Sequence, residues 1–83
     1  MNKLLICLEV PSISAVYEIY LPVFLTVKEL IPLLVKAVGE ISVNRYVSSG
    51  CEFLCAQNPD YILDEDATLA SYDIGHGDHL ILM

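Results

Sequence analysis

The sequence predicts an α+β domain in which one main helix, over about residues 26–39, packs on a mixed sheet of four to five strands. Three observations predict it. The stretch 26–39 carries a clear helical repeat of apolar residues, and the segments on both sides of it alternate apolar and polar residues as half-buried strands do. With 83 residues, the chain has room for one core. We therefore expect a single domain over residues 1–83.

The helix is predicted by its ends as well as by its repeat. Thr26 and Glu29 form a capping-box pair, in which each side chain satisfies a backbone N–H that the first turn leaves unpaired. Gly39 is expected to close the helix in the left-handed conformation. Pro32 lacks the N–H that a helix interior needs, so we expect a kink there. The apolar face consists of Val27, Leu30, Ile31, Leu34 and Val38.

The segment before the helix predicts an antiparallel hairpin. Residues 3–10 and 15–21 both alternate, and turn-forming residues connect them. Glu9 and Glu18 mark the sides of the two strands that face water, and Pro22 ends the second strand because it cannot donate a ladder hydrogen bond. The residues expected to point inward are Leu4, Ile6, Leu8, Val10, Tyr17, Ile19 and Leu21.

The segment after the helix is less regular, and residues 40–50 predict no defined element. A third strand is expected over residues 51–56, with Phe53 and Cys55 on one side and Leu54 and Ala56 on the other. A short fourth strand follows over 61–63. Thr68 is expected to cap a one-turn helix, and a last strand over 79–83 points Leu80 and Leu82 toward the core.

Composition and charge exclude several classes of ligand. The net charge is −7, and the four basic residues all precede Tyr46, so the chain lacks the basic footprint that nucleic acid or an anionic membrane surface requires. A basic protein partner is compatible with this charge. Because 55% of the residues are hydrophobic and only 18% are charged, the sequence favours either a dense core or an apolar interface for a partner or a second copy, as in a homodimer.

Residues 19–38 have the length of a membrane span, but they include Lys28, Glu29 and Lys36 and two prolines, so we expect no membrane insertion. The three cysteines are an odd number without a disulfide framework. On one extended strand Cys51 and Cys55 would lie about 13 Å apart, too far to be bridged. Reduced thiols are expected, and so is a cytoplasmic location, which allows a peripheral position at a membrane complex.

No set of residues predicts catalysis, a cofactor or a metal. Cys51, Cys55, His76 and His79 do not have the spacing of a zinc knuckle, and no base is evident for a cysteine nucleophile. The acidic stretch 64–66 lacks the alternating ligands of a calcium loop. The glycines of the stretch 75–77 indicate a turn, since no third glycine or helix follows to cradle a phosphate. We expect no enzyme activity.

The order of elements and the last third of the chain resemble the ubiquitin or β-grasp superfamily. The carriers are LDEDATLASYDI at 63–74 and GDHLIL at 77–82, which are similar to the family's leucine, acidic turn, Thr-Leu, tyrosine, isoleucine and closing Leu-x-Leu. The resemblance implies that Tyr72 pins its loop through the hydroxyl. It also implies that Leu69, Ile74, Leu80 and Leu82 belong to the core.

Within the superfamily, the chain resembles the small bacterial ubiquitin-like proteins of the YukD or EsaB family, which belong to type VII (WXG100) secretion systems. The likeness lies in residues 17–34 and in the Ile74-x-x-Gly77-Asp78-x-Leu80-x-Leu82 ending. Ubiquitin and the sulfur carriers are conjugated through a tail ending in Gly-Gly, whereas this sequence stops at Leu82-Met83. Conjugation and sulfur transfer are therefore not expected unless the sequence is truncated.

The expected site is a surface for protein binding. If the inward assignments hold, the other face of the sheet carries an apolar patch where ubiquitin also keeps its main recognition patch. The alternative is that the chain's own long loop or a neighbouring molecule covers this face. The predicted protein-binding patch consists of Leu5, Cys7, Tyr20, Leu54, Ile81 and Met83.

The resemblance implies a non-enzymatic interaction module that docks on a component or regulator of a type VII secretion system. Two alternatives stay open. One is a sulfur-carrier-like protein with a longer native C-terminus, and the other is a small accessory subunit of an enzyme complex of the oxygenase type. Neighbouring genes for WXG100 proteins and FtsK-like ATPases would favour the secretion role.

Overall fold

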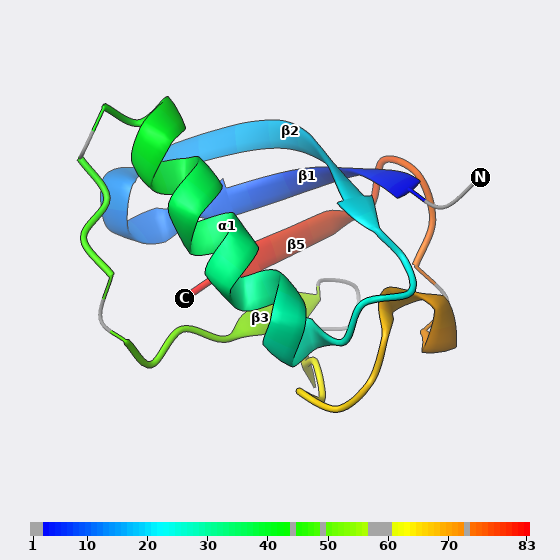
Figure 1. Ribbon diagram of the computed structural model, residues 1–83. Helices are drawn as coiled ribbons and strands as arrows, with labels where there is room; N and C mark the ends of the chain where they lie inside the picture. The colour runs from blue at the N-terminus through cyan, green and yellow to red at the C-terminus, as the bar shows by residue number, and fades with distance from the viewer. Residues whose placement is uncertain (1–2, 44, 49, 57–60, 73) are drawn as a thin grey trace.

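A computed structural model describes residues 3–43, 45–48, 50–56, 61–72 and 74–83. Along the described chain, two strands precede the helix and three follow it (Figure 1). Short 3₁₀ turns occupy Pro11–Ile13 and Leu69–Ser71. The main elements are β1 (Lys3–Val10), β2 (Ala15–Pro22), α1 (Val27–Ile41), β3 (Leu54–Ala56), β4 (Tyr61–Ile62) and β5 (His79–Leu82).

The sheet is mixed and packs on one main helix, as the sequence predicted, and its five strands lie in the order β2-β1-β5-β3-β4. β1 and β2 pair antiparallel over eight residues without a bulge, from Lys3 opposite Pro22 to Val10 opposite Ala15. β5 lies parallel to β1 and antiparallel to β3, so it joins the two halves of the sheet. The chain therefore brings its first and last strands side by side at the centre.

Helix α1 begins where the sequence predicted. The Thr26 hydroxyl accepts a hydrogen bond from the Glu29 N–H at 3.2 Å, and the Glu29 carboxylate accepts one from the Thr26 N–H at 3.1 Å. The helix continues through Pro32, whose side chain is on the exposed side, where water can reach the carbonyl left without a donor.

The prediction that Gly39 closes the helix is wrong. The helix continues to Ile41, and Val43 takes a left-handed conformation with φ of 55°. The Ser42 side chain explains the longer helix, because its hydroxyl donates to the Gly39 carbonyl at 3.4 Å and accepts from the Tyr46 N–H at 3.2 Å. The last turn is thus capped by a serine.

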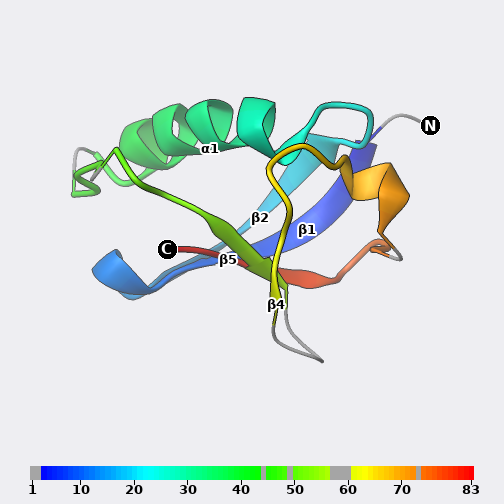
Figure 2. The same cartoon turned by 90° about the horizontal axis from the view of Figure 1, so that it is seen from below.

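The core lies between α1 and the face of the sheet that α1 covers, which we call the inner face (Figure 2). Alternate residues of each long strand point into it. From the helix come Val27, Leu30, Leu34 and Val38, and from the strands Ile6, Leu8, Val10, Leu21, Leu54, Ala56, Leu80 and Leu82, all of which are at most 5% exposed.

The loop between β4 and β5 is tied to the start of α1. Val27 and Lys28 donate their N–H groups to the carbonyls of Ala67 and Glu65 at 2.8 and 2.9 Å. The Tyr72 hydroxyl accepts a hydrogen bond from the Asp64 N–H at 2.8 Å, which confirms the pinning role that the family resemblance implied. Thr68 precedes the short 3₁₀ turn as expected, but its side chain makes no capping hydrogen bond.

The described part of the loop between α1 and β3 does not cover the sheet face opposite the helix. Figure 2 shows residues 42–43 and 45–48 at the level of α1 before the chain descends to β3. Arg45 donates to the Ile13 carbonyl at 3.2 Å and the Tyr46 hydroxyl donates to the Glu52 carboxylate at 2.8 Å. These bonds hold the loop against one end of the sheet. Within the described residues, no helix is long and apolar enough to span a membrane.

Candidate protein-interaction surface

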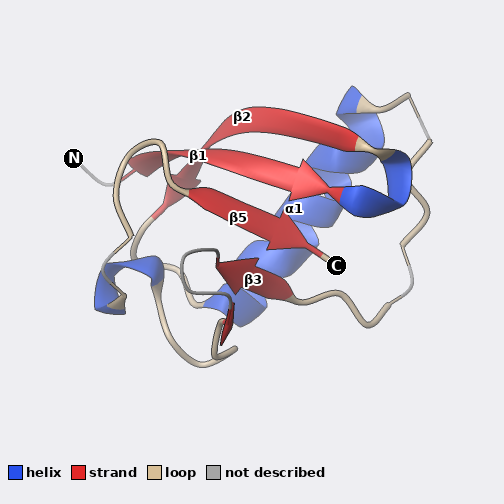
Figure 3. Ribbon diagram, turned by 180° about the vertical axis from the view of Figure 1, so that it is seen from behind, coloured by secondary structure: helices blue, strands red, loops and turns tan. Residues whose placement is uncertain are grey.

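The face of the sheet turned away from α1, which we call the outer face, is the candidate site. Figure 3 shows this face in front of the helix. Because Ile6 and Leu8 point inward from β1, Leu5 and Cys7 must point outward. The register carries this alternation across the sheet, since Leu5 lies opposite Tyr20 on β2 and Cys7 lies opposite His79 on β5.

The structure places five of the six predicted patch residues on the outer face. Tyr20 is 61% exposed and Met83 is 54% exposed, whereas Leu5, Cys7 and Ile81 are half-buried by their neighbours on the strands. Ile81 lies opposite Cys55 on β3, and Met83 exchanges two backbone hydrogen bonds with Phe53, at 2.9 and 3.0 Å. The apolar outer face therefore extends from β2 across β1 and β5.

The assignment of Leu54 to the outer face is wrong. Leu54 is fully buried in the core, where it lies opposite Leu82 in the β3–β5 pair. The cause is the parity of β3: Leu82 points inward from β5, so the residue opposite it must point inward too. Neighbouring residues of a strand point to opposite faces, so Cys55, next to Leu54, points to the outer face.

Sequence reasoning missed two residues of this surface, Cys55 and Ile62. They lie opposite each other in the β3–β4 pair, and Ile62 is 65% exposed. The signal that could have found Ile62 is the burial expected of Leu63, because neighbours on a strand point to opposite sides. Both residues line an open hollow of about 270 Å³, whose other lining residues are Ala56, Tyr61, Ile81 and Met83.

We call the resulting set the outer patch: Leu5, Cys7, Tyr20, Cys55, Ile62, Ile81 and Met83. Polar side chains share this face with the patch. Glu18 on β2 and His79 on β5 flank Cys7, and Glu9 lies between Val16 on β2 and Ile81 on β5. An apolar surface with carboxylates beside it can bind the apolar surface of another protein, and it favours a partner with basic groups around that surface.

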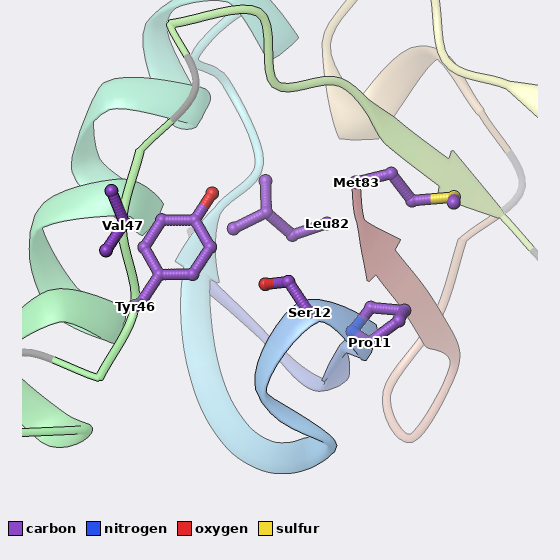
Figure 4. A pocket seen from close by; sticks show the side chains of 6 residues that line it. All are labelled: Pro11, Ser12, Tyr46, Val47, Leu82 and Met83. Carbon is purple, nitrogen blue, oxygen red and sulfur yellow. The ribbon is translucent and has the colours of Figure 1, made fainter.

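A second hollow, of about 270 Å³, lies at the end of the sheet where the α1–β3 loop packs (Figure 4). Its lining residues are Pro11, Ser12, Tyr46, Val47, Leu82 and Met83. Burial, together with the hydrogen bond to Glu52, raises the pKa of Tyr46 to about 12. Its hydroxyl is therefore a donor at neutral pH, and that donor is already used within the chain.

The structure does not gather the cysteines and histidines into a metal site. Cys55 lies opposite Ile81 in the β3–β5 pair, whereas His79 lies opposite Cys7 in the β1–β5 pair. The His76 Nδ1 atom accepts a hydrogen bond from the Leu5 N–H at 3.0 Å, which fixes the turn before β5. Among the described residues, no group of three or more His, Cys, Asp or Glu side chains could hold a metal ion.

Solved structures with this fold are ubiquitin-like. The ubiquitin-like domain of the Mycobacterium tuberculosis type VII secretion system protein EccD1 is similar with a TM-score of 0.78 at 15% identity, over 100% of this chain and 99% of that one. A chain of the MycP5-free ESX-5 inner membrane complex is similar with a TM-score of 0.73 at 15% identity, over 100% of this chain and 21% of that one. The UBL domain of yeast Ddi1 has a TM-score of 0.69 at 13% identity, over 99% and 88% of the two chains.

One helix grasped by a mixed five-stranded sheet, with these neighbours, defines a ubiquitin-like β-grasp protein. The sequence identifies the branch. The model of the family described as "WXG100 protein secretion system (Wss), protein YukD" matches residues 12–82, and the chain belongs to this family. No curated protein sequence matches the chain.

Proposed function

We propose that this protein is a non-enzymatic interaction module that docks its outer patch on a component or regulator of a WXG100 (type VII) secretion system. The observation that carries the proposal is the outer patch itself. Seven apolar or thiol side chains from all five strands share a face that no described segment of the chain covers. Exposed apolar patches of this kind mark protein–protein interaction sites on soluble proteins.

Membership in the YukD family supports the choice of a secretion component as the partner. A chain of the ESX-5 inner membrane complex contains a region with this fold, and this protein matches 21% of that chain. We infer that the protein likewise joins a membrane-associated secretion complex from the cytoplasmic side, by non-covalent binding. In this role, the fold presents a surface, and neither a catalytic group nor covalent conjugation is needed.

The test uses full-length tagged protein expressed in its native host. Ile62→Asp and Ile81→Asp place a charge in the outer patch, and capture of secretion-system proteins should fall by about tenfold or more, because a carboxylate would be desolvated in an apolar contact. Val43→Asp is the matched control, since Val43 is 81% exposed, follows the end of α1 and lines neither hollow beside Met83.

Circular dichroism must show that each variant keeps the fold. Unchanged capture by both outer-patch variants would rule out this surface. An intact-mass measurement of the purified native protein tests the non-covalent part, because an adduct at the C-terminus would contradict it.

A further inference from the structure

The long free edge of the sheet belongs to β2, and this edge lacks the usual protection against pairing. β2 has eight residues, whereas β4 at the opposite edge has two. Edge strands are commonly protected by lysines, bulges or internal prolines. β2 contains no lysine, its register with β1 is unbroken, and its proline stands at its last position, Pro22. Alternate backbone N–H and C=O groups of β2 therefore point away from β1, on the side where no other described strand pairs with it.

An apolar groove runs beside this edge. α1 crosses the sheet obliquely, so the second half of β2 is left beside the helix and not beneath it (Figure 1). The groove has a volume of about 170 Å³, and its lining residues are Ile19, Tyr20, Leu21, Pro22, Leu30, Leu33, Leu34 and Ala37. Leu33, at 52% exposed, and Tyr20, at 61%, leave much of their apolar surface in water.

The charges around the edge favour a basic occupant. Glu18 is the one charged residue of β2 and is exposed. On α1, helical spacing places Glu29, Lys36 and Glu40 beside Leu33 and Ala37, all three exposed, and Lys3 lies opposite Pro22 on β1. Carboxylates thus outnumber ammonium groups around the edge. A second copy of the chain would bring its own net charge of −7 to this edge and would place two Glu18 side chains on the same pair of strands, so a second copy is disfavoured.

We propose that the β2 edge and the α1–β2 groove bind an extended segment of a basic partner protein, which adds to the sheet as a further strand. Because side chains of a strand alternate, every second residue of the segment would enter the groove and should be apolar. The residues between them would lie on the outer side with Glu18, where lysine or arginine fits best. This site shares Tyr20 with the outer patch, but Leu33 lies only in the groove and Ile62 only in the outer patch, so either surface can fail its test while the other stands.

The test uses the folded full chain and two synthetic peptides with free ends blocked, RVKVTVKV and its charge-reversed form EVEVTVEV. The basic peptide should bind saturably and shift the backbone amide NMR signals of residues 15–21, 30–31 and 33–37. The acidic peptide should bind about tenfold or more weakly, because it would place carboxylates beside Glu18. Equal binding of the two peptides, or shifts confined to the outer patch, would overturn the proposal.

Three variants locate the site. Leu33→Asp should weaken binding of the basic peptide by about tenfold, whereas Ile62→Asp, at a similarly exposed position in the outer patch, should bind it as the unchanged protein does. Glu18→Lys should reverse the preference between the two peptides, which also keeps the test valid if Leu33→Asp folds poorly. Failure of this reversal contradicts the assigned occupant.

Methylation of the peptide backbone tests strand addition itself. A strand at an edge donates hydrogen bonds from alternate residues only. N-methylation of the valines or of the residues between them should therefore abolish binding in one series and spare it in the other. Equal effects in both series would exclude an added strand, and amide shifts in β2 on raising the protein concentration without peptide would assign the edge to a second copy instead.

Discussion

The two faces of the sheet are built from the same kinds of side chain but differ in what surrounds them. On the inner face, Ile6, Leu54 and Leu80 have no exposed surface, because α1 covers them. On the outer face, Leu5 and Ile81 are covered only by their neighbours in the sheet, and Ile62 is 65% exposed. Burial here depends on the side of the strand and not on the hydrophobicity of the residue. Substitutions on the inner face should therefore lower the stability of the fold, whereas substitutions on the outer face should weaken binding to a partner.

The largest expected effect separates two aliphatic residues on the adjoining strands β3 and β4. Leu54→Ala should lower the free energy of unfolding by about 3 kcal/mol, because it leaves a cavity in a closed core. Ile62→Ala should cost less than about 1 kcal/mol, since its side chain already contacts water. Urea denaturation of both variants measures the difference. Equal losses would mean that the outer face is as closed as the inner one.

A smaller effect is expected in the loop between β4 and β5. Tyr72→Phe removes the acceptor of the Asp64 N–H and should lower the free energy of unfolding by about 1–2 kcal/mol. Hydrogen exchange at the Asp64 amide should quicken. Tyr20→Phe, on the exposed outer face, is the control and should leave both quantities nearly unchanged. A Tyr72→Phe variant with a protected Asp64 amide would contradict the pinning role.

Two threonines at the starts of helical turns give the next test, because only one of them caps with its side chain. Thr26→Ala should lower the free energy of unfolding by about 1 kcal/mol, since α1 holds the inner face closed. Thr68→Ala should cost less, because the Thr68 side chain makes no capping bond. Thermal unfolding of the two variants compares them, and equal losses would refute the assignment of the cap.

The smallest effect is a pH dependence at the same cap. The hydrogen bonds from Thr26 hold the pKa of Glu29 below its usual range. A lowered pKa in the folded state adds stability that is present above the ordinary glutamate pKa and is lost as the pH falls through the folded value. The difference in Tm between the unchanged protein and Glu29→Gln should therefore shrink from about pH 6 to about pH 3. A difference in Tm that grows as the pH falls would contradict a lowered pKa of Glu29 in the folded state.

The first half of the fold could be predicted from the sequence because charged residues mark its outer face. Glu9 and Glu18 fix the parity of β1 and β2, and Thr26 with Glu29 fixes the start of α1. β3 has no such mark. Phe53, Leu54, Cys55 and Ala56 are apolar or nearly so on both sides, so alternation alone could not decide which side faces the helix. The pairing of β3 with β5 decides it, and this pairing joins residues that are far apart in the sequence.

The same limit explains the end of α1. A glycine after an apolar repeat is the usual local signal for a helix end. Here the Ser42 hydroxyl bonds to the Gly39 carbonyl and to the Tyr46 N–H, and Tyr46 packs on the core, so a contact from the following loop extends the helix. The outward sides of β1, β2 and β5 were thus predicted correctly, whereas the side of Leu54 was not, because its strand lacks a polar marker.

The parallel pairing of β1 with β5 has a consequence for synthesis of the protein. The hairpin of β1 and β2 and the helix can form as soon as the first half of the chain has been made, but one side of β1 stays unpaired until residues 79–82 follow. During that interval Ile6 and Leu8 belong to a sheet with an open edge. The nascent chain is therefore exposed to wrong strand pairing until β5 is made, and β5 both completes the core and ends this period.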